Sequence, residues 1–246
     1  MKFKFIYIFS LMICFCTKAQ KQTYVIDYDF KTSFKTLPNS FIYTSSLYLQ
    51  EGSKQIYQIK YSQGVIKEEK KSNMISPEIS IDLDGADKFF YKPVDGDTLI
   101  YEANVIFKEY IVEDYPEFQW DLTDETKTIL GFLCYKAITS FRGREYIIYY
   151  TREASVSGAP WKFNGLPGLV LEVHSIDEEF QISATSFRIV EDTFIITNPF
   201  NTKAKISWED YKALYTIEYE KALATEKGDP LNFESMPKMQ FELLVD

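Results

Sequence analysis

Residues 132–151 read FLCYKAITSFRGREYIIYYT, and this stretch holds the clearest hairpin signal in the chain. Apolar and polar side chains alternate along Phe132–Phe141 and again along Glu145–Thr151, which is the pattern of strands with one buried face. Arg142, Gly143 and Arg144 lie between the two runs, and Gly143 can adopt the positive φ that a tight reversal often requires. The stretch therefore predicts two antiparallel strands joined by a tight turn.

Short runs of the same kind lie on both sides of this hairpin. They are Thr23–Phe30, Phe41–Gln50, Lys54–Tyr61, Phe89–Pro93, Thr98–Glu102, Val105–Val112, Gly168–His174 and Phe180–Val190. Turn residues separate several of them, at Glu51-Gly52-Ser53, Asp95-Gly96-Asp97 and Asp177-Glu178-Glu179. Asp-Gly between apolar runs is a strong hairpin signal, and Pro116 should end the strand before it.

One long segment has a helical pattern instead. Residues 207–228 read SWEDYKALYTIEYEKALATEKG, with Ser207 as a possible cap, Asp210 three residues on, and Lys227-Gly228 as a stop. The apolar residues fall at spacings of three and four along this segment: Trp208, Tyr211, Tyr215, Tyr219 and Ala222. This stripe predicts a helix packed against a sheet. A second short helix is expected over Asp121–Thr128.

These patterns together define the fold class. We predict a mainly β, α+β fold: a curved antiparallel sheet, with a half-barrel as one form of it, and a C-terminal helix packed on the sheet. The aromatic content of 17% suits a sheet-built core. Because the sequence has no internal repeat and no long linker, residues 20–246 are expected to form a single β-rich domain.

The N-terminus predicts export. Lys2 and Lys4 precede a 12-residue apolar run, Phe5–Cys16, and Thr17-Lys18-Ala19 follows it. This is the pattern of a signal peptide over residues 1–19, cleaved near Ala19. A spanning helix needs roughly 20 apolar residues, so no stable membrane anchor is expected after cleavage. The mature protein is then periplasmic or extracellular.

The net negative charge of the chain disfavours some classes of binding partner. Loss of Lys2, Lys4 and Lys18 with the signal would lower the 27 basic residues to 24 against 36 acidic ones, a net charge of −12. Such a surface repels phosphate backbones, so nucleic-acid binding is disfavoured. It also disfavours docking on anionic lipid by charge alone. An apolar ligand or a protein partner remains compatible with this charge.

Recognisable catalytic and cofactor patterns are few. Cys134 is the one cysteine outside the signal and His174 is the one histidine of the chain, so the usual zinc shell cannot be built. Cys134 lies among apolar neighbours and is expected to be buried. Asp82–Asp87 lacks the glycine and glutamate positions of a calcium-binding EF-hand loop. No cofactor, no metal and no catalytic residue are therefore predicted. Arg142 and Arg144 are expected to be solvated at the hairpin tip or to bind an anion there.

Residues 120–173 are the most distinctive part of the chain. They contain WDLTDETKTILG at 120–131, CYKA at 134–137, FRGR at 141–144, GAPWKFN at 158–164 and GLPGLVLEV at 165–173. In this order they resemble the GLPGLI family, exported proteins of Bacteroidota, with Val170 in place of the final isoleucine. The family has no established biochemical activity. The resemblance implies an envelope location and a shared fold, and it assigns no catalytic residue.

Residues 158–168, which we call the motif loop, are compatible with two structural roles. Pro160 and Pro167 restrict the backbone, and Gly165 and Gly168 permit close approaches. Trp161, Phe163 and Leu166 supply large apolar side chains. The loop is therefore either a rigid turn fixed to the core or the lip of a pocket. In the second case the binding residues are Trp161, Phe163, Gly165, Leu166, Pro167 and Gly168.

Three functions are compatible with these features. The leading hypothesis is a non-enzymatic binding or accessory protein for an apolar ligand or an outer-membrane protein partner. The competing hypothesis is a carboxylate-dependent hydrolase of envelope polymers or peptides. The 36 acidic residues allow it, but its two carboxylates must lie at a defined distance in space, which a sequence does not give. The third is a structural or assembly factor, whose sign would be a broad exposed apolar patch.

Overall fold

A computed structural model of the protein describes residues 22–33, 39–50, 54–68, 79–80, 86–93, 97–106, 108–191, 196–226 and 242–245. Several expected features lie outside these ranges: the signal peptide, the turn at 51–53, residues 95–96 of the Asp-Gly turn, residues 82–85 of the acidic loop, and the helix stop at 227–228. Within the described part, no helix is both long enough and apolar enough to cross a membrane.

The described strands form one continuous sheet. Their order is β13-β7-β6-β5-β3-β2-β1-β12-β11-β10-β9-β8, and β4 pairs with β3. The strands are β1 (Thr23–Ser33), β2 (Asn39–Gln50), β3 (Gln55–Glu68), β4 (Ile79–Ser80), β5 (Lys88–Lys92), β6 (Leu99–Val105), β7 (Lys108–Asp114), β8 (Asp121–Ile129), β9 (Phe132–Phe141), β10 (Arg144–Thr151), β11 (Leu169–Ser175), β12 (Phe180–Val190) and β13 (Lys205–Ser207). All neighbours are antiparallel except β13 and β7, which are parallel.

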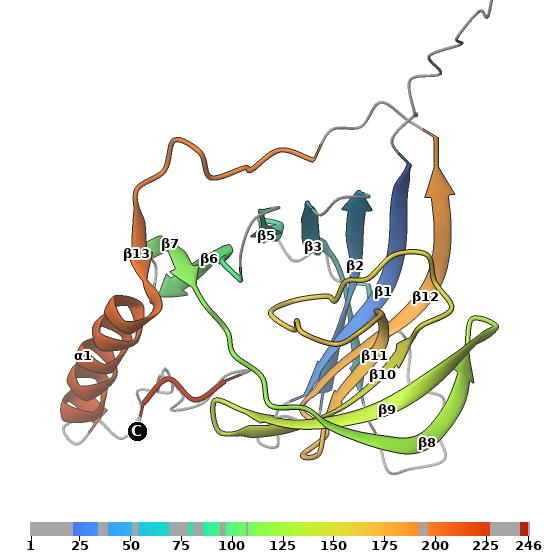
Figure 1. Ribbon diagram of the computed structural model, residues 1–246. Helices are drawn as coiled ribbons and strands as arrows, with labels where there is room; N and C mark the ends of the chain where they lie inside the picture. The colour runs from blue at the N-terminus through green and yellow to red at the C-terminus, as the bar shows by residue number, and fades with distance from the viewer. Residues whose placement is uncertain are drawn as a thin grey trace, which may run out of the picture.

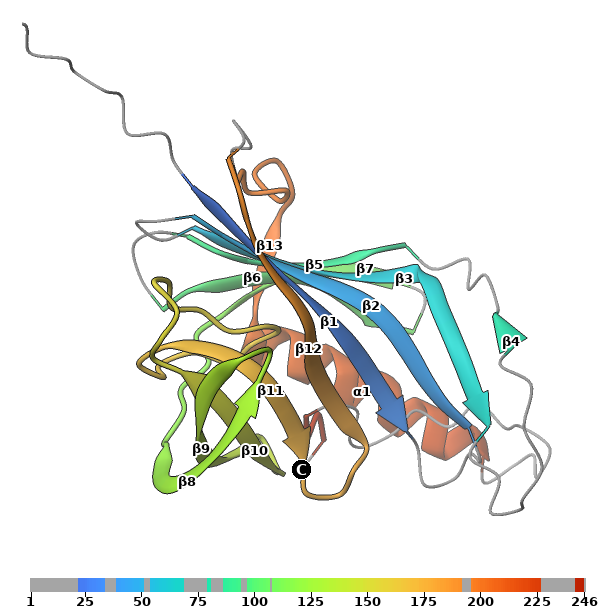
Figure 2. The same cartoon turned by 90° about the vertical axis from the view of Figure 1, so that its right-hand side faces the viewer.

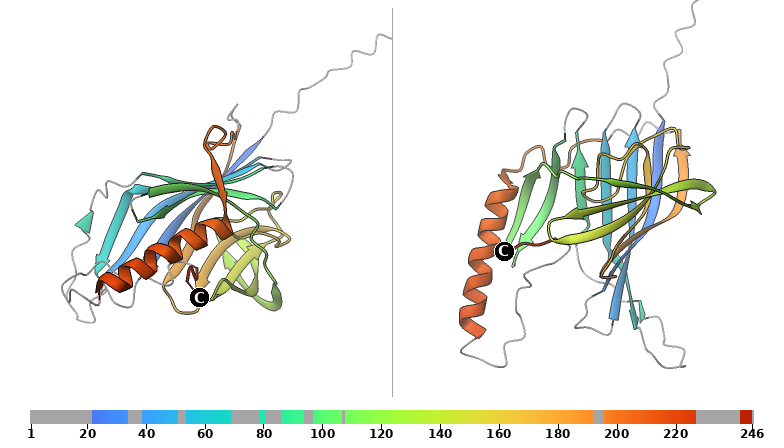
Figure 3. Two further views of the ribbon diagram at one scale, coloured as in Figure 1. Left: turned by 90° about the vertical axis from the view of Figure 1, so that its left-hand side faces the viewer. Right: turned by 60° about the horizontal axis from the view of Figure 1, so that its bottom comes forward.

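The sheet is strongly bent, and one helix lies inside the bend. Figures 1 and 2 show β8–β11 turned towards the same side of β1–β3 on which α1 (Trp208–Glu226) lies. Figure 3 shows α1 below the β5–β7 part of the sheet, and the helix contacts β6, β7 and β13. The open, curved sheet with a packed C-terminal helix confirms the predicted fold class.

Alternation along the strands creates the concave core. Tyr24, Ile26, Tyr28 and Phe30 of β1 are all at most 4% exposed and belong to the main buried cluster. The same cluster contains Trp208, Tyr211 and Tyr215 of α1. The predicted helical stripe therefore packs on the sheet, because its side chains extend the apolar face of β6 and β7.

The predicted hairpin of β9 and β10 is present. Arg144 pairs with Phe141, and a two-residue turn joins the strands. Both turn residues have positive φ, 44° at Arg142 and 81° at Gly143, which is the backbone geometry that matches the twist of a tight hairpin.

Two predictions about local structure are wrong. The expected strand Val105–Val112 is divided into β6 and β7 at Ile106, whose φ is 52°. The expected helix Asp121–Thr128 is strand β8, which pairs with β9. The segment is rich in threonine, which favours strands, and pairing with a neighbouring strand outweighs its weak helical pattern. Its side chains are mostly exposed, as suits a polar edge strand.

A smaller cluster covers the convex face at β5, β6 and β7. Tyr91, Ile100 and Ile111 pack there against Ile196 and Phe200. The last two residues belong to the connection from β12 to β13, which passes along the top of the view in Figure 1. This connection brings the chain from one part of the sheet to its opposite edge, and so places α1 at the concave side.

Candidate functional site

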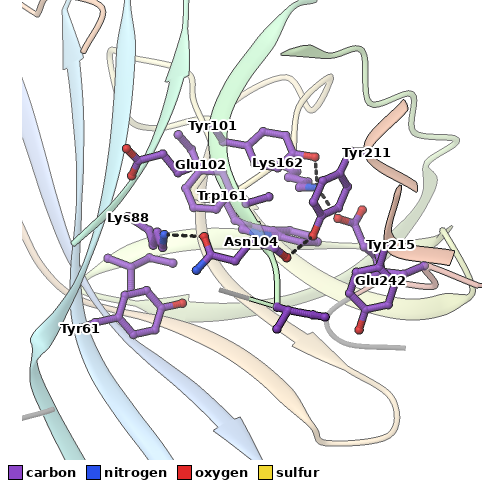
Figure 4. Close-up of a pocket in the computed structure, with 15 residues that line it drawn as sticks. Tyr61, Lys88, Tyr101, Glu102, Asn104, Trp161, Lys162, Tyr211, Tyr215 and Glu242 are labelled. Atoms are coloured by element: carbon purple, nitrogen blue, oxygen red, sulfur yellow. Dashed lines mark hydrogen bonds and ion pairs between the residues drawn. The ribbon is translucent and has the colours of Figure 1, made fainter. Parts of the chain in front are cut away.

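A cavity of about 350 Å³ lies on the concave side of the sheet. Strands β3, β5 and β6, the motif loop, α1 and the C-terminal residues contribute to its wall. Among the described residues, six aromatic side chains line it: Tyr61, Phe90, Tyr101, Trp161, Tyr211 and Tyr215. Figure 4 shows Tyr61 and Lys88 at one end of the cavity and Tyr215 and Glu242 at the other. A concave, ring-lined cavity with a few polar groups is the usual form of a small-ligand site.

Neighbouring elements fix the rings of this wall. Tyr101 of β6 stacks on Phe90 of β5 with ring centroids 5.4 Å apart. The hydroxyl of Tyr211 donates a hydrogen bond to the carbonyl of Asn104 at 3.0 Å, which ties α1 to β6. Trp161 has a φ of 54°, a strained backbone angle that turns the loop into the cavity wall.

A buried charged cluster closes one end of the cavity. Lys162 is 2% exposed, and its ammonium donates to the Tyr101 hydroxyl at 2.7 Å and forms an ion pair with Glu242. Asp114 lies 3.7 Å from the same Nζ atom. Arg142 bonds to Asp114 through both terminal nitrogens, at 2.7 and 2.9 Å, and to Glu242 at 2.8 Å. We call Lys162, Arg142, Asp114 and Glu242 the charged quartet.

Burial and pairing act against each other within the quartet. Burial lowers the pKa of Lys162 from its ordinary value, and the charges of Glu242 and Asp114 oppose this change. Burial alone would raise the pKa of Asp114, but hydrogen bonds from Arg142 and the charge of Lys162 hold it below its ordinary value. Two cations and two carboxylates balance, so the quartet can stay ionised although it is buried.

The rings beside the quartet also stabilise its cations. Arg142 lies over the Trp208 ring with 3.7 Å between the guanidinium carbon and the ring centroid. The ammonium of Lys162 lies 4.0 Å from the centroid of Tyr101 and 4.7 Å from that of Trp208. Such cation–π contacts are strongest where the cation is desolvated.

Residues 109–213 match the family described as N-glycanase peptide, N-terminal domain. The matched segment contains Asp114, Arg142, Trp161, Lys162 and Tyr211, and it ends before Glu242.

Two solved structures of PNGF-II are also similar. The one in space group C2 has 20% identity and a TM-score of 0.49, over 80% of this chain and 33% of PNGF-II. The one in space group P21 has 19% identity and a TM-score of 0.50, over 80% of this chain and 34% of PNGF-II. The chain thus spans about a third of the length of PNGF-II, and the likeness concerns the fold. No curated protein matches the chain.

The structure separates the residues of the predicted motif loop. Trp161 lines the cavity, whereas Phe163 is fully buried in the core against Tyr146 and Phe180. Gly168 lies so close to the Thr151 carbonyl that an added Cβ would be 2.1 Å from its oxygen.

The rest of the loop lies away from the cavity. Gly165 has a φ of 81° and is exposed, as is Pro167, while Leu166 is half-buried. Phe163, Gly165, Leu166, Pro167 and Gly168 are not among the residues that line the cavity.

The prediction of solvated or anion-binding arginines at the hairpin tip is wrong. Arg144 is 4% exposed and pairs with Asp177 at 3.0 Å and with Glu179 at 2.7 Å. Arg142 belongs to the charged quartet. Both side chains fold back onto the protein because acidic residues from distant segments lie beside the tip.

Cys134 and His174, which the sequence also singled out, are not among the residues that line the cavity. Cys134 is fully buried and free, as predicted. His174 is partly exposed, and its Nδ1 atom lies 3.5 Å from Glu172. Within the described ranges, no three His, Cys, Asp or Glu side chains are grouped so that they could hold a metal ion.

Sequence reasoning missed the polar half of the site. Lys162 lies inside the motif, between Trp161 and Phe163, but a lysine is ordinarily an exposed residue. The only signal was its position in a proline- and aromatic-rich loop. Asp114 and Glu242 carried no signal, because their partners are far away in the sequence.

Proposed function

We propose that the chain is a non-enzymatic binding or accessory protein whose ligand enters the cavity on the concave side of the sheet. The observation that carries this proposal is the wall of six aromatic rings beside a buried, charge-balanced quartet. A protein gains nothing in stability from leaving such a volume unfilled. A cavity of this size is within the range of small-ligand sites.

The charges of the wall favour a neutral ligand. Glu242 pairs with Lys162, and Glu102 pairs with Lys203 at 3.1 Å. Lys88 donates to Asn104 at 3.2 Å and lies 3.9 Å from Glu109. Each charged group among the described residues that line the cavity thus has a partner within the protein. Among these residues a charged ligand would find no unpaired opposite charge to compensate its loss of water. The paired carboxylates also give no support to a hydrolase mechanism.

A neutral glycan is the first ligand to consider. The family that matches residues 109–213 is named for an N-glycanase, and sugar rings have apolar faces that stack on aromatic side chains. Their hydroxyls could bond to polar groups such as the Asn104 amide and the Tyr61 hydroxyl. We propose that the chain helps to bind such a glycan, without assigning it the cleavage reaction. A purely apolar ligand would use the same rings.

Ligand titration with a matched pair of variants tests this function. The full chain is titrated with N,N′-diacetylchitobiose and with a medium-chain fatty alcohol while tryptophan fluorescence is recorded. Tyr61→Ala, in the cavity wall, should abolish the response, whereas Tyr115→Ala, 59% exposed and outside the cavity, should retain it. A response to the alcohol alone would identify an apolar ligand. No response to either probe would contradict the proposal.

We also propose that the protein is exported and related to GLPGLI proteins. The proposal rests on the signal-like residues 1–19 and on the order of motifs in residues 120–173. Intact mass measurement on protein from the envelope of its host should give the mass of the chain without residues 1–19. A cell-associated protein of precursor mass would contradict export.

A further inference from the structure

The C-terminal residues 242–245 lie across one side of the concave face. In Figure 1 this segment (red) runs between α1 and the strands β8–β10. The Leu243 amide donates a hydrogen bond to the Arg142 carbonyl at 2.7 Å. Leu244 and Val245 are 2% and 7% exposed. An added Cβ on Gly143 would be 2.9 Å from the Cβ of Leu243, so the segment is in close contact with the hairpin tip.

The segment supplies one of the two carboxylates of the charged quartet. Glu242 bonds to Arg142 at 2.8 Å and pairs with Lys162. Without it, the fully buried Lys162 and the partly buried Arg142 would share the single carboxylate of Asp114. Lys162 would then lose its closest charged partner, which is costly for a buried ammonium. The body of the protein therefore contains a preformed socket for a carboxylate.

The contacts follow the geometry of an extended peptide. Glu242 and Leu244 both line the cavity, two residues apart, as alternate side chains of an extended chain do. The backbone of Leu243, between them, bonds to the hairpin. A carboxylate, a backbone amide and an apolar side chain are thus recognised at three successive positions. Contacts to alternate side chains give specificity in the recognition of extended peptides, although here the segment adds no strand to the sheet.

We propose that the socket at Lys162, Arg142 and the hairpin tip is a peptide-binding site that the chain's own residues 242–245 occupy reversibly. Its ligand is an extended segment with an acidic residue followed, two positions later, by an apolar one. Leu243 forms a single β-bridge, and Leu244 and Val245 belong to the main buried cluster, but none of the thirteen described strands includes the segment. Its release would expose these two apolar side chains and would break no strand ladder of the sheet. Glu242 and Leu244 also line the cavity, so the segment and a cavity ligand share one wall, but the experiments below use no cavity ligand.

Amide hydrogen exchange on the full chain tests whether the segment opens by itself. Ile148 lies at the centre of β10, is fully buried and reports global unfolding. We expect the Leu243 amide to exchange at least about a hundredfold faster than that of Ile148, because local opening is easier than unfolding. Equal rates at the two amides would overturn the proposal and make the segment a fixed part of the fold.

A competing peptide tests the recognition itself. A fluorescent, end-blocked peptide QFELLVD, residues 240–246, is titrated into the Glu242→Gln variant. We expect saturable binding, with the Glu-to-Gln peptide binding about tenfold more weakly because it cannot pair with the socket. The unaltered chain should also bind the peptide about tenfold more weakly, because its own segment competes at a high effective concentration.

The control variant is Glu209→Gln, an exposed substitution on α1 that should behave as the unaltered chain does. Equal binding of both peptides, or no saturable binding by a folded Glu242→Gln chain, would overturn the proposal. If Glu242→Gln does not fold, the exchange rate of Leu243 in the unaltered chain decides the question.

Discussion

Lys162 is the residue on which the buried charge balance depends. Replacement Lys162→Met keeps most of the side-chain volume but leaves Asp114 and Glu242 to share the charge of Arg142. We expect a loss of about 3–5 kcal/mol in the free energy of unfolding, because one partner of a buried pair is removed. Urea denaturation followed by circular dichroism measures it.

The matched control is the double variant Lys162→Met/Glu242→Leu. It removes one charge of each sign and leaves the Arg142–Asp114 pair, so it should recover most of the lost stability. A double variant as unstable as the single one would mean that packing around Lys162, not charge balance, is what the single substitution disturbs.

The free energy of unfolding should depend on pH, because the pKa of Lys92 differs between the folded and the unfolded protein. Its ammonium donates to the Phe163 carbonyl at 2.5 Å, and burial lowers its pKa to about 7, against the opposing charge of Asp97. Between pH 7 and 10 the unfolded chain holds a proton that the folded protein has released. Stability should therefore rise with pH in this range, by up to about 1.4 kcal/mol per unit from this group. Below pH 7 both states are protonated, and the slope from Lys92 vanishes.

Denaturation curves at pH 7, 8 and 9 measure the slope. Lys92→Met should reduce it, while Lys108→Met, at an exposed position, should leave it unchanged. Identical slopes for both variants and the unaltered chain would show that Lys92 does not titrate in this range.

At the scale of the elements, the loss of stability on replacing Gly168 or Gly131 with alanine tests the backbone geometry at these two turns. At Gly168 an added Cβ would be 2.1 Å from the Thr151 carbonyl oxygen, which the sheet holds in place. At Gly131, in the turn between β8 and β9, φ is 86° and no atom lies within 4 Å of an added Cβ. We expect Gly168→Ala to cost more than about 4 kcal/mol and Gly131→Ala about 1 kcal/mol, from backbone strain alone. Similar losses, measured by thermal unfolding, would contradict the close approach at Gly168.

The elements also show what a sequence can predict. The β9–β10 hairpin, the β12 strand and α1 have strong local signals, and the structure confirms them. Strand β8 has a polar, mostly exposed sequence, so its conformation depends on pairing with β9 rather than on its own pattern. The division of β6 from β7 at Ile106 could not be predicted, because an isoleucine rarely adopts a positive φ.

At the scale of the whole molecule, the site could be predicted only in part. The motif loop drew attention to Trp161 because its composition is unusual. The partners of Lys162 come from the end of β7, the hairpin tip and residue 242, and the last is separated from Lys162 by 80 positions. Such a cluster exists only after the sheet has bent, since the bend brings the two ends of the strand order together around α1 and the C-terminal segment.

The same bend predicts how the protein unfolds. One buried cluster contains Tyr24 of β1, Phe90 of β5, Ile148 of β10, Trp161 and Tyr215 of α1. Neither half of the sheet nor the helix can bury its apolar side chains without the others, so we expect a single cooperative transition in urea. The far-UV signal of the backbone and the fluorescence of the tryptophans should change at the same urea concentration. Leu244 and Val245 also belong to this cluster, but because no strand includes residues 242–245 we expect this segment to open first among the described residues, and it contains no tryptophan. A fluorescence change at clearly lower urea would mean that α1, with Trp208, detaches from the sheet before the core is lost.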